Sequence, residues 1–292
     1  MAIRPRRSVL YMPGSNERAL EKARTLPADG VILDLEDSVA PDGKVEARTR
    51  VVEAVNAGGF GQREVIIRIN GLETPWGMED LDAAASAKPD AILVPKVQSV
   101  EQLETVGRRL EKLGTGPDTR VWAMIETPLA ILDIRAIAAA SQNPRTRLSV
   151  FVLGTNDLAK DTRAALVPGR APMLGWLSLC VAAARVYGID VLDGVWNQFK
   201  DLDGFKAECA QGVAFGMDGK TLIHPSQIEP SNEAFSPPPE DVERARQIIS
   251  AFELPENAGK GVITIDGRMV ELLHAEMAKR TVALADAIAA RV

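Results

Sequence analysis

Eight short apolar segments occur along the chain, with helical patterns between them. Short apolar runs bounded by turn residues indicate buried strands, and longer amphipathic runs indicate helices. Strands that alternate with helices form a parallel sheet, and eight such units are the number that closes a (β/α)8 barrel. The sequence therefore predicts an α/β fold of the TIM-barrel type, with a doubly wound open sheet as the alternative. The expected strands are residues 8–13, 30–37, 64–70, 91–96, 121–127, 148–157, 188–194 and 219–225.

The last part of the chain is more than a barrel needs. Residues 225–242 contain five prolines and indicate a linker or an extended segment. An amphipathic helix, a glycine-flanked strand or hairpin at 257–271 and a final helix from about residue 269 to 290 are expected to follow. We therefore expect a catalytic barrel over residues 1–228 and a C-terminal segment over 229–292. This segment would form a lid on its own barrel or an arm that reaches a neighbouring subunit.

Composition excludes several classes of protein. The formal net charge is −6 and the basic residues are dispersed, so a nucleic-acid partner is not expected. No apolar run reaches the roughly 18 residues of a membrane span, and the apolar stretch at the N-terminus is too short for a signal peptide. Cys180 and Cys209 lack the spacing of a metal or redox motif. We expect them to be buried thiols in a cytoplasmic protein.

The first two strand ends carry candidate binding groups, because barrel enzymes place their chemistry where strands end. The turn Pro13-Gly14-Ser15 leads into a helix whose free N–H groups would favour an anion. Alternatively, it is an ordinary turn in which Ser15 or Asn16 caps the helix. Strand 30–37 ends with three carboxylates, which need cations or hydrogen bonds nearby: Asp34, Glu36 and Asp37.

The next strand ends suggest a metal site. Arg68 lies within an apolar strand and needs an anionic partner, either a carboxylate of this protein or one of a substrate. Lys96 follows the fourth strand, and Glu126 and Asp157 follow the fifth and sixth. Two carboxylates on neighbouring strands can share Mg²⁺, which keeps its other positions for water and substrate oxygens. The alternative is that Glu126 and Asp157 only pair with Arg68 and Lys96. With two histidines in the chain, His224 and His274, a zinc site is not expected.

Eight motifs in order resemble one known family. They are RSVLYMPGS, VILDLEDSVAPDGK, IRIN with TPWG, ILVPKV, MIETP, LGTNDLAKD, DGKTLIHPSQI and GKGVITIDGRMV, and they extend from about residue 6 to 288. This set is similar to the citrate lyase β-subunit-like (CitE-like) group of the HpcH/HpaI aldolase superfamily. Members are magnesium-dependent barrels that cleave carbon–carbon bonds of acyl-CoA or acyl-carrier esters, and some are malyl-CoA thioesterases.

The resemblance implies roles for the strand-end residues. Glu126 and Asp157 match the ligands of Mg²⁺, for which Mn²⁺ could substitute. Arg68 matches the arginine that grips the carboxylate of a 2-oxo acid. Asp37 matches an acid near the waters of the metal, and Glu36 could share that task.

Other matched positions have less defined roles. The Pro13-Gly14-Ser15 turn lies where CoA or the acid is approached, and Lys96 matches a strand-end lysine. His224 lies in a segment that the family places near CoA, although from the residues alone we expect it to stabilise the last strand end. Asp266 matches a catalytic acid that reaches a neighbouring subunit's active site. This implies a homo-oligomer, a trimer or hexamer; alternatively, Asp266 is a hairpin-turn residue before Gly267.

The resemblance implies a CoA-ester lyase. It would cleave a 3-hydroxyacyl-CoA of the malyl-CoA, methylmalyl-CoA or citramalyl-CoA type into a 2-oxo acid and acetyl-CoA or propionyl-CoA. Two alternatives remain open: a (3S)-malyl-CoA thioesterase that uses the same site, and the β subunit of a citrate lyase complex.

Overall fold

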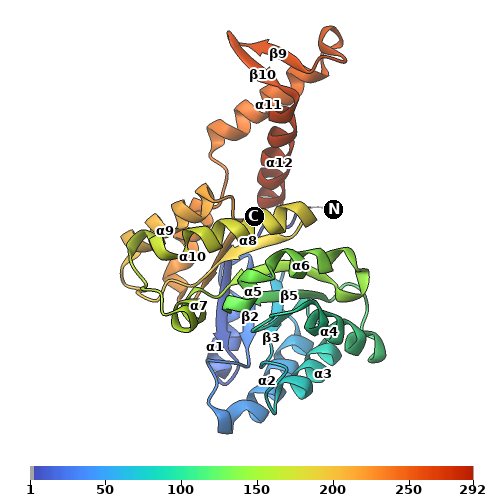
Figure 1. The fold of residues 1–292 in the computed structure, drawn as a ribbon, viewed down its shortest axis with the longest axis vertical. Coiled ribbons are helices and arrows are strands. Elements are labelled where there is room, and N and C mark those ends of the chain that lie inside the picture. The colour runs from blue at the N-terminus through green and yellow to red at the C-terminus, as the bar shows by residue number, and fades with distance from the viewer. Residues whose placement is uncertain (1–2, 292) are drawn as a thin grey trace. The chain divides into compact units, whose positions relative to one another are not determined.

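The computed structural model describes residues 3–291, and its largest part is a closed barrel of eight parallel strands (Figure 1). Each strand pairs with the next one along the chain, and β8 pairs back with β1. This arrangement confirms the predicted (β/α)8 barrel rather than the open sheet. The strands are β1 (Ser8–Pro13), β2 (Gly30–Asp34), β3 (Glu64–Arg68), β4 (Ala91–Val94), β5 (Arg120–Ile125), β6 (Leu148–Leu153), β7 (Asp190–Asp193) and β8 (Gly219–Leu222).

Strands after the first end earlier than the apolar pattern suggested. β2 stops at Asp34, so Asp37 lies in the loop that follows it. β6 stops at Leu153, and Asp157 lies in the first turn of the next helix. Polar side chains such as Asp34, Arg68 and Glu126 occur at or just after the last residue of these strands. The polar and ionisable residues that could bind or react therefore lie on the rim of the barrel.

The inside of the barrel is filled by side chains, as expected for this fold. Successive strand residues point to opposite faces, so every second residue enters the interior. The interior cluster comprises Val9, Ile32, Ile66, Ala91, Leu93, Trp122, Met124, Val150, Val152 and Leu192. Because Val9 belongs to this cluster, Tyr11 also points inward, and its side chain packs against the cluster. Tyr11 thus closes the core towards the rim.

Helices surround the barrel and return the chain to its starting edge (Figure 1). In α4 (Val100–Lys112), Ser99 and Gln102 form a capping box, and Leu103, Val106 and Leu110 are buried on one face. The other helices of this unit are α1 (Glu17–Ala23), α2 (Lys44–Ala57), α3 (Gly77–Ala87), α5 (Pro128–Leu132), α6 (Ile134–Ala139), α7 (Thr155–Thr162), α8 (Leu174–Tyr187), α9 (Leu202–Ala214) and α10 (Ile228–Ala234). Short 3-10 turns lie at Pro41–Gly43, Ala140–Gln142, Pro144–Thr146, Pro168–Met173, Pro225–Gln227 and Pro255–Asn257.

A salt-bridge clamp joins opposite strands near the N-terminal end of the barrel. Arg6, just before β1, donates from Nε and Nη2 to the Glu64 carboxylate, at 2.7 and 2.8 Å. Its Nη1 pairs with Asp190, the first residue of β7. The guanidinium carbon lies 5.4 Å from the centre of the Trp122 ring, within cation–π range. One side chain therefore connects β1, β3, β5 and β7.

The chain divides into two compact units. One is Arg6–Asn232, and the other combines residues 233–291 with residues 3–5. The second unit contains α11 (Pro239–Glu253), β9 (Val262–Ile265), β10 (Arg268–Glu271) and α12 (Leu272–Ala289). β9 and β10 form an antiparallel hairpin, and α11 packs against α12. No helix within residues 3–291 is both long enough and apolar enough to cross a membrane.

Two details of the C-terminal prediction are wrong. Residues 225–242 are not extended throughout, because a 3-10 turn and α10 lie within them. Pro230 does not prevent this helix, since it lies in the first turn, where an N–H group has no helical partner to lose. The final helix begins at Leu272, and Met269 belongs to β10.

Candidate active site

A cavity of about 320 Å³ opens at the carboxyl ends of the barrel strands. This is the end at which TIM-barrel enzymes carry their active sites. All the residues that line it belong to the Arg6–Asn232 unit. They are Tyr11, Asp34, Asp37, Ser38, Arg68, Met124, Glu126, Leu153, Gly154, Thr155, Asn156, Asp157, Val195, Asn197, Thr221 and Ile223.

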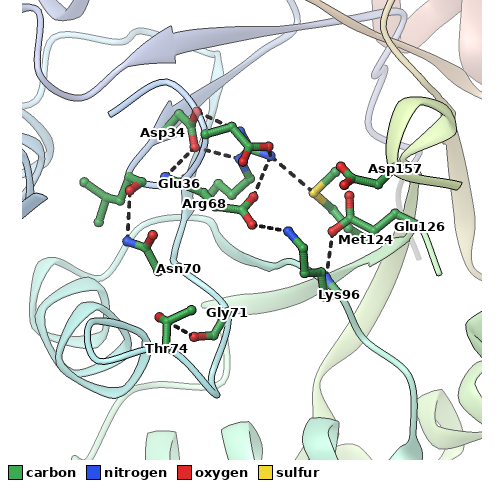
Figure 2. Close-up of polar contacts among 12 residues, drawn as sticks. Asp34, Glu36, Arg68, Asn70, Gly71, Thr74, Lys96, Met124, Glu126 and Asp157 are labelled. Atoms are coloured by element: carbon green, nitrogen blue, oxygen red, sulfur yellow. Dashed lines mark hydrogen bonds and ion pairs between the residues drawn. The ribbon is translucent and has the colours of Figure 1, made fainter. Parts of the chain in front are cut away.

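Arg68 is held by a carboxylate of this protein. Its Nε and Nη2 donate to the two oxygens of Asp34, at 2.6 and 2.8 Å, in a buried bidentate pair (Figure 2). The backbone N–H groups of Glu36 and Ser38 also donate to Asp34. Burial disfavours the charge of Asp34, but Arg68 and these donors outweigh it and lower its pKa. Nη1 of Arg68 faces Glu36, at 2.8 Å, and Asp37, at 3.4 Å.

Glu36 links the cations Arg68 and Lys96. Its Oε1 accepts from Nζ of Lys96 at 2.7 Å, and its Oε2 forms the ion pair with Arg68 (Figure 2). Burial raises the pKa of Glu36 despite these two cations. Burial opposes the charge of Lys96, but Glu36 more than offsets this and raises the lysine pKa. Neither Glu36 nor Lys96 lines the cavity, whereas Asp37 is exposed at the cavity wall. A catalytic role for Glu36 and substrate binding by Lys96 stay predictions.

Glu126 is buried directly after β5, and no side-chain cation within residues 3–291 is bonded to it. Its Oε1 accepts from the backbone N–H of Lys96 at 2.7 Å. Burial, followed by repulsion from Glu36, raises the pKa of Glu126 to about 7. Gly154 allows the carboxylate to lie there, because a Cβ on Gly154 would lie 2.4 Å from the Glu126 Cβ. This glycine is required by close approach rather than by backbone conformation.

Asp157 lines the same cavity as Glu126, and both are labelled in Figure 2. Its nearest cation is Lys160, whose Nζ lies 3.7 Å away. The strand-end cations Arg68 and Lys96 are instead paired with Asp34 and Glu36. The structure therefore does not form the alternative cluster in which Glu126 and Asp157 only neutralise Arg68 and Lys96.

The two carboxylates fit a hard divalent cation. A buried carboxylate with a raised pKa and no bonded cation favours a positive ligand nearby. Within residues 3–291, no group of three or more His, Cys, Asp or Glu side chains could enclose a metal. Mg²⁺ suits such a site, because it binds through one or two carboxylates and fills its remaining positions with water or substrate. Glu126 and Asp157 are the residues that would hold it.

The cavity also contains residues that the sequence pattern did not single out. The face of the Tyr11 ring lies under Arg68, with 4.8 Å between Cζ and the ring centre. Asn156 and Asn197 exchange hydrogen bonds of 3.1 and 2.9 Å between their amides. Tyr11 could have been found, because it follows Val9 with the period of two that marks one strand face. Asn197 lies in an irregular loop after β7, where no periodic signal exists.

The Pro13-Gly14-Ser15 turn is a packed connection outside the cavity lining. Gly14 donates to the backbone oxygen of Asp34 at 2.9 Å, and a Cβ on Gly14 would lie 2.6 Å from that oxygen. Asn16 caps α1 by accepting from the N–H of Ala19. The structure thus agrees with the alternative of an ordinary turn in which Asn16 caps the helix. A role of this turn in binding CoA stays a prediction.

His224 and Asp266 have local structural roles. His224 caps the 3-10 turn after β8, and its ring stacks on Phe199 with 4.7 Å between ring centres. Asp266 lies in the C-terminal unit, at the exposed turn between β9 and β10, with φ 49° followed by φ 74° at Gly267. Such angles are those of a tight hairpin turn. Substrate contact by His224 and catalysis by Asp266 remain predictions.

Comparison with known proteins gives consistent matches over the whole chain. The model of the HpcH/HpaI aldolase/citrate lyase family matches residues 7–225. The chain is 49% identical over 286 residues to a (3S)-malyl-CoA thioesterase of Cereibacter sphaeroides, covering 98% of this chain and 96% of that protein. It is 34% identical over 313 residues to an L-malyl-CoA/β-methylmalyl-CoA lyase of the same species, covering 98% and 96%.

A solved structure is also similar. The protein CitE of Mycobacterium tuberculosis, in complex with magnesium, acetoacetate and coenzyme A, superposes with a TM-score of 0.74 at 28% identity. The match covers 94% of this chain and 97% of that one. Motifs, barrel and comparisons agree: the chain belongs to the HpcH/HpaI aldolase/citrate lyase family, whose members include CoA-ester lyases and thioesterases.

Proposed function

We propose that the chain is a Mg²⁺-dependent hydrolase of malyl-CoA that releases malate and free CoA. The site supports CoA-ester chemistry because two carboxylates without bonded strand-end cations, Glu126 and Asp157, line one cavity with Arg68. The observation that favours hydrolysis over carbon–carbon cleavage is the 49% identity to a (3S)-malyl-CoA thioesterase, against 34% to a malyl-CoA lyase. The thioesterase alternative is therefore preferred to the lyase that the motifs first suggested.

The side chains of the barrel unit have separate roles in this proposal. Glu126 and Asp157 would hold the cation, which would act as a Lewis acid on a carbonyl oxygen. Nη1 of Arg68 donates to the carboxylate of the malyl group. Asp34 fixes the plane of the guanidinium by accepting from Nε and Nη2. Glu36 keeps Arg68 and Lys96 in place.

Hydrolysis requires proton transfer as well as binding. Water adds its oxygen to the thioester carbon, the carbon–sulfur bond breaks, and the thiolate leaves and is protonated. Asp37 is exposed at the cavity wall and is suited to accept a proton from this water. We assign the second proton transfer to Asp266 of a neighbouring subunit, in a homotrimer or hexamer. Measurement of the native mass would test this assembly and would also reveal citrate lyase partner chains.

Product analysis tests the proposal directly. Malyl-CoA is incubated with the protein and Mg²⁺ in ¹⁸O-labelled water, and the products are identified by mass spectrometry. Hydrolysis gives free CoA and malate with one labelled carboxylate oxygen. Acetyl-CoA and glyoxylate without free CoA would refute hydrolysis and establish the second candidate, the lyase. The variant Glu126→Gln is the control for background hydrolysis and should form neither pair of products.

A further inference from the structure

Two hydrogen-bond donors on the cavity wall converge on one sulfur atom. The Tyr11 hydroxyl lies 3.9 Å from Sδ of Met124, and Nη1 of Arg68 lies 3.7 Å from the same sulfur. A thioether is a weak acceptor, and both contacts are long. Within residues 3–291 the Tyr11 hydroxyl has no other hydrogen bond, so its donor lacks an oxygen acceptor.

The protein fixes the position of this hydroxyl. Tyr11 lies on the inward face of β1, where its ring packs against the barrel core. The guanidinium of Arg68 covers the ring face at 4.8 Å, and Asp34 holds that guanidinium in turn. A side chain with two rotatable bonds that is packed in this way keeps its hydroxyl in place without a bond to it. The hydroxyl is therefore positioned for a molecule in the cavity.

We propose that Tyr11 is a substrate-binding residue, whose hydroxyl and Arg68 Nη1 donate together to one carboxylate oxygen of the acyl group. This inference rests on the proposed function, since it assigns the contact to the malyl carboxylate. Arg68 Nη1 has two N–H groups, so it can face Glu36 and Asp37 with one and the substrate with the other. An anionic oxygen accepts far better than the Met124 sulfur, because hydrogen bonds to charged groups are the stronger ones.

The substitution Tyr11→Phe isolates this contact. It removes the hydroxyl and retains the ring, so core packing and the contact with Arg68 remain. The hydroxyl has no strong partner within the described chain, so the variant should unfold at the same urea concentration as the wild type. The chain has two tyrosines, and Tyr187 at the end of α8 lies outside the cavity. Tyr187→Phe is therefore a matched control.

Two measurements test the inference. Isothermal titration gives the Kd of L-malate for the Mg²⁺-loaded protein, and steady-state kinetics give KM and kcat for malyl-CoA. For Tyr11→Phe we expect Kd and KM to rise by about 10- to 100-fold, the effect of losing one hydrogen bond to a charged group. We expect kcat to change by less than about threefold, because the contact exists in ground and transition states alike. Tyr187→Phe should match the wild type.

Each deviation has a defined meaning. Unchanged Kd and KM in Tyr11→Phe would overturn the inference, as would a wild type that does not bind L-malate. A fall in kcat at constant KM would move the hydroxyl to the reacting carbonyl and overturn the carboxylate assignment. A lower urea midpoint would indicate a structural role and overturn it as well. A wild type that binds malate more tightly than Tyr11→Phe but releases no CoA would uphold the inference and refute the proposed hydrolysis.

Discussion

The substitution Glu126→Gln should stabilise the metal-free protein above neutral pH while abolishing its response to Mg²⁺. In the folded state, burial and Glu36 raise the pKa of Glu126 from 4.5 to about 7. The difference, at about 1.4 kcal/mol per pKa unit, corresponds to about 3 kcal/mol of unfolding free energy. Glutamine has the same shape and can accept from the N–H of Lys96, but it carries no charge to bury.

The sign of the effect follows from the order of ionisation. Below pH 4.5 Glu126 is protonated in both folded and unfolded chains, so it imposes no cost. Between pH 4.5 and about 7 the unfolded chain ionises first, which favours unfolding as the pH rises. Above about pH 7 both states are ionised, and the folded wild type carries the full penalty. The advantage of Glu126→Gln should therefore grow from zero to about 3 kcal/mol across this window.

Urea unfolding of both proteins at several pH values, with and without Mg²⁺, measures this effect. Mg²⁺ should stabilise the wild type at pH 8 and leave Glu126→Gln unchanged, since a ligand that binds only the folded state raises its stability. Glu53→Gln on the exposed face of α2 removes one charge elsewhere and is the matched control. A Glu126→Gln protein that is less stable than the wild type at pH 8 without metal, or a difference independent of pH, would refute the reasoning.

Three further substitutions test the geometry of the site. Asp157→Asn should weaken Mg²⁺ binding, measured by titration. Loss of a residue that only contacts a metal ligand weakens binding by about 10- to 100-fold, and loss of a direct ligand should weaken it more. Unchanged affinity would show that Asp157 is not part of the metal site. Gly154→Ala should cost about 1–3 kcal/mol of unfolding free energy and reduce Mg²⁺ affinity, because its Cβ would displace Glu126, and wild-type values for both would contradict this. Arg68→Lys keeps the charge but loses the fork on Asp34, so kcat/KM for malyl-CoA should fall by about 10- to 100-fold, whereas an equal value would show that charge alone suffices.

The positions of the candidate functional residues were predictable, because a TIM barrel carries its active site at the carboxyl ends of its strands. The polar residue at the end of each apolar run was expected on the rim, as for Glu126 and Arg68, although most strands stop earlier than the apolar pattern suggested. The pairing among these residues was not predictable. Three carboxylates lie at or just after the end of β2. Only the folded geometry shows that Asp34 pairs with Arg68, while Glu36 joins Arg68 to Lys96. The distances between side chains on different strands decide these pairings, and the sequence does not give those distances.

Other parts of the site have weaker signals in the sequence. Tyr11 had a signal in the alternation of β1, but its hydroxyl became notable only beside the Met124 sulfur. Asn197 belongs to a loop whose course depends on tertiary contacts. The helical character of α10 was missed because prolines near it suggested extended structure, although proline is compatible with a first turn.

The Arg6 clamp has a consequence for the order in which the chain folds. Its partner Glu64 belongs to the first half of the barrel, whereas Asp190 lies 184 positions after Arg6 in the chain. Contacts between distant positions carry the largest loop-closure cost and form after local ones. Arg6 can pair with Glu64 early but completes the clamp only after β7 has joined the sheet. Glu64 alone already balances the charge of the guanidinium, and Asp190 adds a second carboxylate only when the barrel is nearly closed. The complete pairing of Arg6 therefore distinguishes a finished barrel from a partly assembled one.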